Sequence, residues 1–342
     1  MSRKLIVTNF AYGTGPYLRT TELAIAFNDE LEKAGYPRID IIVPLVYGEN
    51  QRKIMTEEGL LSDEVILDAE LGGILEKVFY GNGNYVEYLK KWVAGFKEIS
   101  REAQEYLLKK YGSEIAVELN RSPRILYGIA PAYSASFGYF SRMFKELGDR
   151  KASGIAECIE KEQRMIVVGY PGLFSKEGDY KVPPISLIPQ PNNEKIDKGI
   201  FITKSGIPNL ERLYKSAANF GIKIYSNSDY SPALITNKNI LLHFARAGWA
   251  SIWFSMLAEK PLVVPEYDPA DDPEIYFNNK IIEKLGIGIV YHEESLEELL
   301  IKLDKSADVC RTINKEILDR WGTLDGTQYA AKIFAKDFLK KL

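Results

Sequence analysis

The feature that most constrains the fold is a regular alternation of short apolar runs with amphipathic segments. Near the N-terminus, Leu5–Phe10 predicts a strand, residues 18–34 predict a helix ending at Ala34-Gly35, and residues 39–44 predict a second strand. A strand, a helix and a strand in this order form a βαβ unit, which joins parallel strands. The pattern predicts an α/β protein with doubly wound parallel sheets.

The same alternation continues to the end of the chain. A long amphipathic helix is expected at Tyr85–Lys110, whose many charges favour a solvated outer face, with a membrane-surface patch as the alternative. Further strands are expected at residues 124–129, 165–169, 185–189, 199–203, 222–225 and 261–264, and residues 240–244 form an apolar stretch. Further helices are expected at residues 208–220, 249–258, 275–285, 296–305, 308–319 and 326–342.

A polar segment, PQPNNEKIDKG, separates the two halves. It carries two prolines and stands where the alternation stops and restarts. A chain of 342 residues is also long enough for two domains. We therefore expect one domain over residues 1–192 and a second over residues 193–325.

Composition and charge exclude several classes of protein. With 46% hydrophobic and 27% charged residues the chain is typical of globular proteins, and its net charge of -3 argues against a nucleic-acid partner. Cys158 and Cys310 lie outside any ligand spacing, so we expect two buried thiols and neither zinc nor a disulfide. His243 and His292 are the only histidines, which argues against a site built on several of them and favours structural roles.

The N-terminus leads directly into a strand, and no apolar run reaches the roughly 18 residues of a spanning helix. We expect a cytoplasmic protein, with contact at the inner face of the membrane left open.

The turn after the first strand reads Gly13-Thr14-Gly15-Pro16-Tyr17-Leu18-Arg19. Its glycines permit a close approach of the backbone, and the following helix N-terminus favours an anion or polar hydroxyls. A dinucleotide fingerprint would need a glycine at Leu18 and an acid at the end of the second strand, whereas Asp40 lies at its start. The turn therefore argues against NAD.

Two turns in the second half are suited to phosphate oxygens. Lys204-Ser205-Gly206 follows the strand at residues 199–203 and offers a hydroxyl, a glycine and a helix N-terminus. The second turn, RAGWAS, runs from Arg246 to Ser251 and leads into a helix. A cation beside backbone N–H groups suits phosphate oxygens, although Arg246 as a surface ion-pair residue is the alternative.

Residues 246–264 resemble the donor-binding segment of GT-B glycosyltransferases. The GWAS at residues 248–251 is similar to the GWNS of plant UDP-glycosyltransferases, and the RAG at residues 246–248 is similar to the RSG of MurG. Upstream, YPGLF at residues 170–174 resembles the FPGAF-like end of the MurG N-terminal domain. GTGPYLR at residues 13–19 resembles the GxGHxxR turn of related transferases.

This resemblance implies a GT-B fold, in which two Rossmann-like doubly wound domains face each other across a cleft. The C-terminal domain would bind a nucleotide-sugar, the N-terminal domain would bind the acceptor, and the helix at residues 326–342 would return to the N-terminal domain. The implied reaction moves a sugar, from a UDP-sugar as the favoured donor, to a small or lipid-linked acceptor. It would need no metal and no cofactor.

The resemblance and the chemistry of the turns together select candidate residues. Trp249 would stack on the nucleotide or simply pack, and Asp272 or Glu274 would read the donor sugar. The full donor set is Ser205, Gly206, Arg246, Gly248, Trp249, Ser251, Asp272, Glu274 and Asn278. The acceptor set is Gly13, Gly15, Tyr17, Arg19 and Ser134. Glu22 is the candidate catalytic base, with an ordinary first-turn glutamate as the alternative.

The sequence departs from the family pattern at two positions. Pro16 stands where the GxGH families have a histidine, and Phe254 stands where the donor helix usually carries a ribose-binding glutamate. Two alternatives therefore stay open. One is a nucleotide-sugar hydrolase or epimerase on the same fold, and the other is a non-catalytic GT-B-like binding protein. The acidic loop at Asp268, Asp271 and Asp272 suggests a metal-binding DxD motif, but that motif belongs to a different glycosyltransferase fold.

Overall fold

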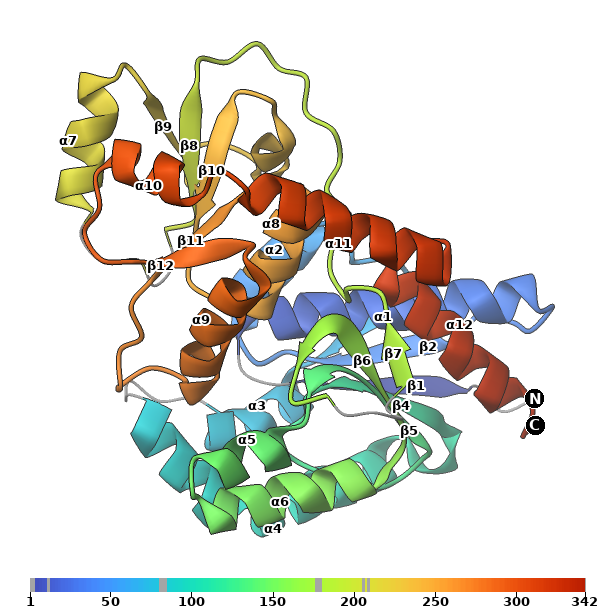
Figure 1. Cartoon of the computed structure of the whole chain (residues 1–342). Coiled ribbons are helices and arrows are strands. Elements are labelled where there is room, and N and C mark those ends of the chain that lie inside the picture. Colours follow the sequence, from blue (N-terminus) through green and yellow to red (C-terminus); the bar gives the residue numbers. More distant parts are fainter. Residues whose placement is uncertain are drawn as a thin grey trace. The chain divides into compact units, whose positions relative to one another are not determined.

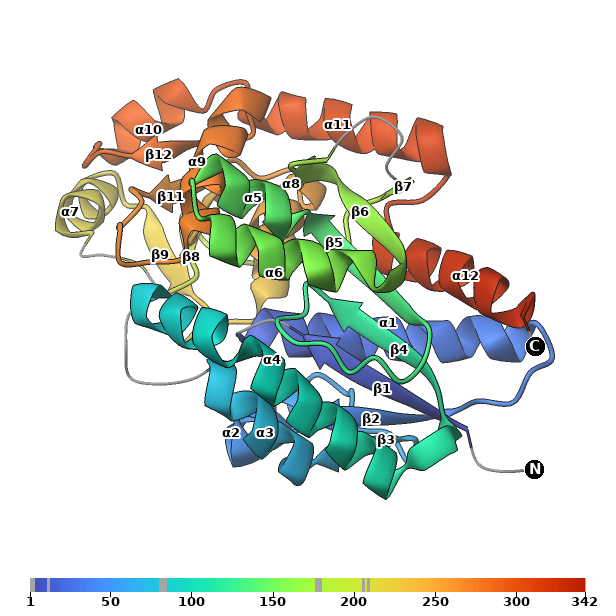
Figure 2. The same ribbon diagram turned by 90° about the horizontal axis from the view of Figure 1, so that it is seen from below.

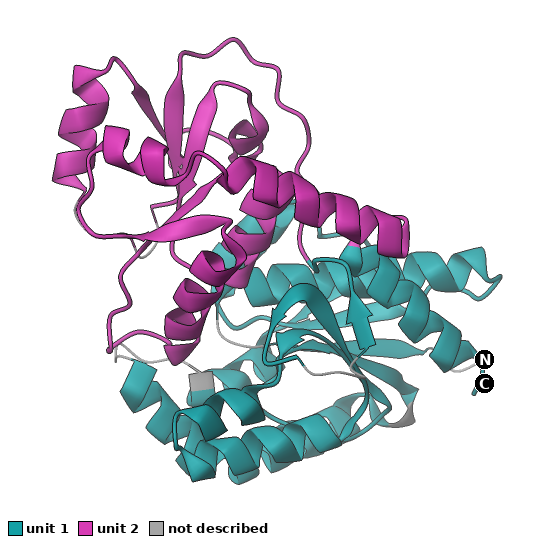
Figure 3. Ribbon diagram, viewed as in Figure 1, with its two compact units in different colours: residues 1–185, 326–342 teal, residues 186–325 magenta. Residues whose placement is uncertain are grey.

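The computed structural model describes residues 4–10, 13–79, 85–175, 180–204, 207 and 210–341. The chain divides into two compact units, which Figure 3 colours separately. Unit 1 comprises Met1–Ile185 and Gly326–Leu342, and unit 2 comprises Ser186–Asp325. The division expected between residues 192 and 193 lies in the segment that opens unit 2.

Unit 1 is built on a parallel sheet of seven strands in the order β3-β2-β1-β4-β5-β6-β7. Its strands are β1 (Leu5–Phe10), β2 (Asp40–Pro44), β3 (Val65–Asp68), β4 (Ile115–Arg121), β5 (Ala132–Gly138), β6 (Gln163–Leu173) and β7 (Tyr180–Val182). The strand order reverses between β1 and β4, which lie side by side. Ligands of doubly wound sheets bind outside the carboxyl ends of the strands at such a reversal.

Helices cover both faces of this sheet. They are α1 (Thr14–Lys33), α2 (Gly48–Glu57), α3 (Ala69–Phe79), α4 (Tyr85–Lys110), α5 (Phe140–Glu146), α6 (Arg150–Lys161) and α12 (Gly326–Leu339), with a short 3-10 helix at Gly112–Glu114. Figures 1 and 2 show α1 and α12 side by side on one face, with α4, α5 and α6 on the other. The Asp337 carboxylate fixes α12 by accepting hydrogen bonds from the Tyr133 hydroxyl and the Arg164 guanidinium.

Unit 2 has a parallel sheet of five strands in the order β12-β11-β10-β8-β9. Its strands are β8 (Gly199–Ile202), β9 (Lys223–Ser226), β10 (Ile240–Phe244), β11 (Leu262–Pro265) and β12 (Gly288–Tyr291). Its helices are α7 (Glu211–Asn219), α8 (Trp249–Leu257), α9 (Pro273–Leu285), α10 (Leu296–Lys302) and α11 (Ser306–Trp321), with a 3-10 helix at Pro232–Thr236. Here the strand order reverses between β8 and β10.

Alternation along β8 places apolar side chains on both faces of the unit 2 sheet. Ile200 and Ile202 join a buried cluster with residues of α7 and α10, such as Leu213 and Leu299. Phe201 points to the opposite face, where Phe254 of α8 packs against its cluster. A strand that is buried on both faces reads as a continuous apolar run, which explains why the sequence predicts β8.

Several predicted elements differ from the structure. Residues 124–129 and 185–189 are not strands, and β4 lies at Ile115–Arg121 instead. Pro123 lacks the N–H that a central strand needs, and Ser122 before it has a φ of 49°, so the chain leaves the sheet there. The sequence analysis also did not predict α2, α3, α5, α6, β3, β5, β7 and β12. Cys158 is exposed on α6, so the prediction of two buried thiols was wrong for it, whereas Cys310 is buried.

No helix in the described part of the chain combines the length and the apolar character needed to cross a membrane.

Candidate functional site

The carboxyl edge of the unit 2 sheet carries an open helix N-terminus. The chain leaves β10, passes Arg246 and Gly248 and enters α8 at Trp249. Gly248 occupies the N-cap position in extended backbone and has no side chain with which to cap the helix, and the first turn contains no acid. The N–H groups of this turn therefore face the edge of the sheet next to the strand reversal, an arrangement that favours an anion.

Arg246 and Asp271 form a bidentate ion pair at this edge. Arg246 Nε donates to Asp271 Oδ2 at 2.8 Å, and the second guanidinium bond to Oδ1 measures 2.6 Å. Both side chains are about one third exposed. Burial acts to raise the pKa of Asp271, but the hydrogen bonds and charge of Arg246 outweigh it and hold that pKa below its usual value. The sequence left open whether Arg246 forms an ion pair, and the structure shows that it does.

The acidic residues that follow β11 are held in place by local hydrogen bonds. Asp272 is the N-cap residue of α9, and its Oδ1 accepts a bond of 2.9 Å from the backbone N–H of Glu274. Asn278 Nδ2 donates to Glu274 Oε1 at 3.0 Å and to the backbone oxygen of Ala247 at 2.7 Å. This links the Glu274 carboxylate to the turn that precedes α8.

The other expected donor residues differ in how accessible they are. Trp249 is only 4% exposed, and its ring lies 5.0 Å from that of Trp253, so it packs within the unit. Ser251 is half-buried in the first turn of α8. Phe254, at the family's glutamate position, packs against an apolar cluster. Ser205 and Gly206 lie outside the described residues.

The two histidines have different surroundings. His243 Nε2 lies 2.9 Å from Thr203 Oγ1, just beyond β8, and its Nδ1 lies 2.6 Å from Ser255 Oγ on α8. Burial lowers the pKa of His243 to about 3, so the ring is neutral and joins two strands to one helix. His292 is exposed and hydrogen-bonded to Glu266.

In unit 1, Glu22 lies on α1 beside the strand reversal. Its carboxylate pairs with Arg19, with N–O distances of 2.6 and 2.7 Å. Burial raises the pKa of Glu22 to about 7, although the charges of Arg19 and Arg121 lower it in part. A carboxyl group that titrates near neutral pH has the property required of a general base.

Arg121 is a residue that sequence reasoning missed. It is the last residue of β4, is 9% exposed and pairs in register with Phe10 at the end of β1. Its charge acts on Glu22. The prediction placed the strand at residues 124–129, so Arg121 was not recognised as a strand-end residue. The sequence does contain a signal for Arg121. Pro123 disfavours a continuing strand, so the ELNR segment at residues 118–121 marks the end of the strand before it.

The expected acceptor residues lie around the same helix N-terminus, apart from Ser134. Gly13 has a φ of 109°, which requires glycine, and its N–H donates to the Tyr47 hydroxyl at 2.7 Å. A Cβ added to Gly15 would meet no atom within 4 Å. Tyr17 is 1% exposed and its ring packs near Phe10 and Tyr47.

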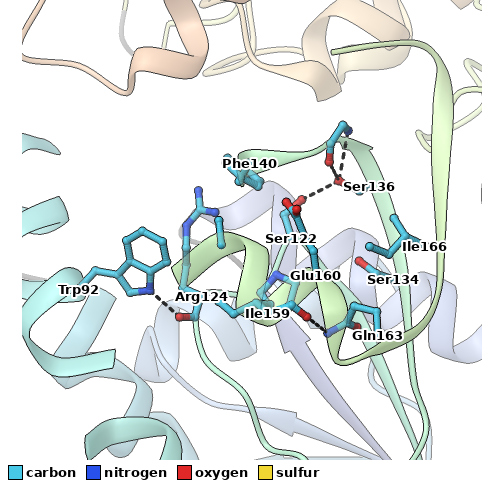
Figure 4. Close-up of a pocket in the computed structure, with 13 residues that line it drawn as sticks. Trp92, Ser122, Arg124, Ser134, Ser136, Phe140, Ile159, Glu160, Gln163 and Ile166 are labelled. Atoms are coloured by element: carbon cyan, nitrogen blue, oxygen red, sulfur yellow. Dashed lines mark hydrogen bonds between the residues drawn. The ribbon is translucent and has the colours of Figure 1, made fainter. Parts of the chain in front are cut away.

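Ser134 lines a small cavity inside unit 1. Figure 4 shows this cavity, where the hydroxyl groups of Ser122 and Ser136 lie 3.1 Å apart. Its volume of about 20 Å³ is enough for one water molecule, not for a sugar acceptor. Glu160 also lines it and is bonded to Ser141.

Among the residues that the structure describes, no three His, Cys, Asp or Glu side chains come together as metal ligands would. Metal independence of the reaction stays a prediction.

No protein-family model matches the chain, and no curated protein matches it. Solved structures match it over nearly its whole length. CalG4, the calicheamicin glycosyltransferase, has a TM-score of 0.60 at 14% identity, covering 100% of both chains. UGT2 from Phytolacca americana, solved with UDP-2fluoro-glucose and pterostilbene, has a TM-score of 0.63 at 10% identity, covering 98% of this chain and 100% of that chain. SsfS6 from Streptomyces sp. SF2575, solved with thymidine diphosphate, has a TM-score of 0.59 at 12% identity, covering 98% and 99%.

These identities are too low to carry an activity across, but the likeness in fold extends over both units. The predicted fold class is confirmed: the chain has the α/β fold of GT-B glycosyltransferases, built from two Rossmann-like doubly wound parts.

Proposed function

We propose that this chain is a glycosyltransferase that moves a sugar from a nucleotide-sugar to a small hydroxyl-bearing acceptor. The observation that carries the proposal is the N-terminus of α8, whose N-cap Gly248 has no side chain, next to Arg246 at the strand reversal of unit 2. Backbone N–H groups and a cation stabilise the charge that a departing diphosphate gains in the transition state. Unit 2 is the proposed donor domain and unit 1 the proposed acceptor domain.

In the proposed donor site, the diphosphate lies against the first turn of α8 and Arg246. Gly248 permits a close approach because it has no side chain and, among the described residues, no atom lies within 4 Å of the place that a Cβ would take. Ser251 adds a hydroxyl, and Ser205 with Gly206 contributes a second turn. The Glu274 and Asp272 carboxylates accept hydrogen bonds from the donor-sugar hydroxyls.

Glu22 is the proposed catalytic base of an inverting transfer. It takes the proton from the acceptor hydroxyl while that oxygen attacks the anomeric carbon. The bond between the anomeric carbon and the phosphate oxygen breaks, and the nucleotide diphosphate leaves with the electron pair. The carboxyl of Glu22 suits this step because its pKa of about 7 makes it a stronger base than an exposed glutamate.

Hydrolysis of the nucleotide-sugar is the second candidate, because the same Glu22 carboxylate could take the proton from water. A non-catalytic binding protein is favoured by Phe254, which packs in an apolar cluster where the family carries a ribose-binding glutamate. We propose UDP-sugar as the donor class, transfer without a metal ion and a cytoplasmic location. A lipid-linked acceptor with contact at the membrane is the less favoured form of the proposal.

Thermal unfolding with a panel of UDP, GDP, ADP, dTDP and CMP tests the donor site, because a ligand that binds the folded state raises Tm. We expect one nucleotide to stabilise the protein and Arg246→Ala to remove that shift. Arg311→Ala is the matched control, since Arg311 on α11 pairs with Glu259, beyond the opposite end of α8. If no nucleotide shifts Tm at millimolar concentration, the donor-site proposal is wrong.

A further inference from the structure

Two adjacent asparagines on α9 each donate a hydrogen bond to a backbone oxygen at or after the end of a strand in unit 2. Asn279 Nδ2 donates to the backbone oxygen of Pro265, at the end of β11, at 2.9 Å. Asn278 Nδ2 donates to the backbone oxygen of Ala247, beyond β10, at 2.7 Å. Both side chains are buried. The two residues therefore perform the same structural task, each with one amide-to-carbonyl hydrogen bond.

Asn278 differs from Asn279 in one contact. Its Nδ2 also donates to Glu274 Oε1 at 3.0 Å, one helical turn earlier on α9. Both partners of this amide nitrogen are acceptors, so the two hydrogens of the NH₂ group are both used. Exchanging the amide oxygen and nitrogen would place Oδ1 against a carbonyl oxygen and a carboxylate, which repel it. The orientation of the amide is therefore fixed by its partners.

The remaining atom of this amide also faces inward. Asn278 is 0% exposed, and within the described part of the chain its Oδ1 has no hydrogen-bond partner. The side chain is therefore not available to a ligand at the surface of unit 2. What it does control is the place of the Glu274 carboxylate relative to Ala247, which lies between Arg246 and Gly248.

We infer that Asn278 is a positioning residue that sets donor-sugar recognition by fixing Glu274 against the turn before α8, and that it does not contact the donor itself. The inference rests on the proposed function, because it needs a nucleotide-sugar whose diphosphate occupies this turn. Because Asn278 holds the Glu274 side chain in one position, that side chain loses little conformational entropy when it binds a sugar hydroxyl. This raises the affinity for the nucleotide-sugar but not for the free nucleotide, which has no sugar to contact Glu274.

The test compares Asn278→Asp with Asn279→Asp by isothermal titration of UDP and of UDP-glucose, or of the nucleotide chosen by the thermal panel and its glucose conjugate. Both substitutions keep the side-chain shape and remove an NH₂ donor facing a strand-end carbonyl. Only Asn278→Asp also places a carboxylate against Glu274. We expect it to weaken binding of UDP-glucose about tenfold, as for loss of a hydrogen bond to a charged group, and to change UDP binding by less than about twofold.

Two further variants separate positioning from a general loss of structure. Glu274→Ala should lower the ratio of the affinity for UDP-glucose to the affinity for UDP. The double variant with Glu274→Ala and Asn278→Asp should show the same ratio as Glu274→Ala alone. If Asn278→Asp does not fold, Asn278→Ser, whose hydroxyl can donate only one hydrogen bond, carries the same comparison.

The outcomes distinguish the inference from the proposed function. If the wild-type chain binds neither ligand, the proposed function fails and the inference fails with it. Suppose instead that the wild type binds both ligands, and that Asn278→Asp changes the ratio of the UDP-glucose affinity to the UDP affinity no more than Asn279→Asp does. The inference about Asn278 is then wrong, and the proposed function is unaffected. The same holds if Asn278→Asp weakens UDP and UDP-glucose equally.

Discussion

The guanidinium of Arg246 and the carboxylate of Asp271 form two hydrogen bonds, of 2.8 and 2.6 Å, close to the N-terminus of α8. The cation that we propose for the donor diphosphate thus already holds an anion supplied by the chain. A diphosphate must share Arg246 with Asp271 or displace it. We therefore expect Asp271 to limit how tightly the proposed donor site binds a free nucleotide.

Asp271→Asn should tighten binding of the favoured nucleotide. An ion pair that is about one third exposed contributes up to about 1 kcal/mol, so removing the competing charge should strengthen binding up to about fivefold. Isothermal titration measures the change, with Asp268→Asn as the control, because Asp268 is exposed on the same loop and accepts a bond from Ala270. Weaker binding by Asp271→Asn would mean that Asp271 positions Arg246 rather than competing for it.

The rate of transfer should rise with pH through about 7, because Glu22 must be ionised to accept a proton and its pKa is raised to about 7. Glu22→Gln should lower kcat by about 10²- to 10⁴-fold, remove this rise and leave nucleotide affinity unchanged. Glu30→Gln is the control on the same helix, where Glu30 pairs with Lys33. A pH profile that Glu22→Gln leaves intact would assign the base to another group.

His243 should make the protein less stable in acid. Its pKa is lowered to about 3 in the folded state, whereas an unfolded histidine titrates near 6.5, so the unfolded state binds the extra proton between these values. Stability is unaffected by this group above about pH 6.5 and falls as the pH drops, by about 2 kcal/mol at pH 5.

Urea unfolding of His243→Gln at pH 7 and pH 5 checks this. The variant should lose less stability over this interval than the wild type, whereas His292→Gln at the exposed histidine should behave as the wild type. An equal loss in the wild type and His243→Gln would show that other groups cause the acid sensitivity.

The parts of the fold that the sequence predicted best are elements rich in apolar residues, although the apolar strand β12 was missed. β1 was predicted at its observed bounds, the apolar stretch noted at residues 240–244 coincides with β10, and α8 was predicted one residue too long. Burial on both faces makes such strands mostly apolar, and their few polar residues, Thr8, Asn9 and His243, are buried with them. β4 and β5 carry buried polar residues, Glu118 and Ser134 among them, that are bonded or paired inside the sheet, so their sequences do not read as strands.

The candidate site was predictable only where it depends on the backbone. The glycine-containing turns at Gly13 and Gly248 follow strands that the sequence predicts, and strand ends place such turns at an edge of the sheet. The pair of Arg246 with Asp271 joins residues from different loops, and the raised pKa of Glu22 depends on burial. Neither follows from local spacing, because both require the tertiary structure.

The most direct test of the account is release of free nucleotide from UDP-glucose, or from the glucose conjugate of the nucleotide that binds, with and without small hydroxyl-bearing acceptors. The account predicts that free nucleotide appears together with a glycosylated acceptor, that little appears without an acceptor, and that Glu22→Gln and Arg246→Ala each reduce product formation. Release at the same rate without an acceptor would contradict transfer and favour hydrolysis. Binding without any release would contradict an enzyme altogether.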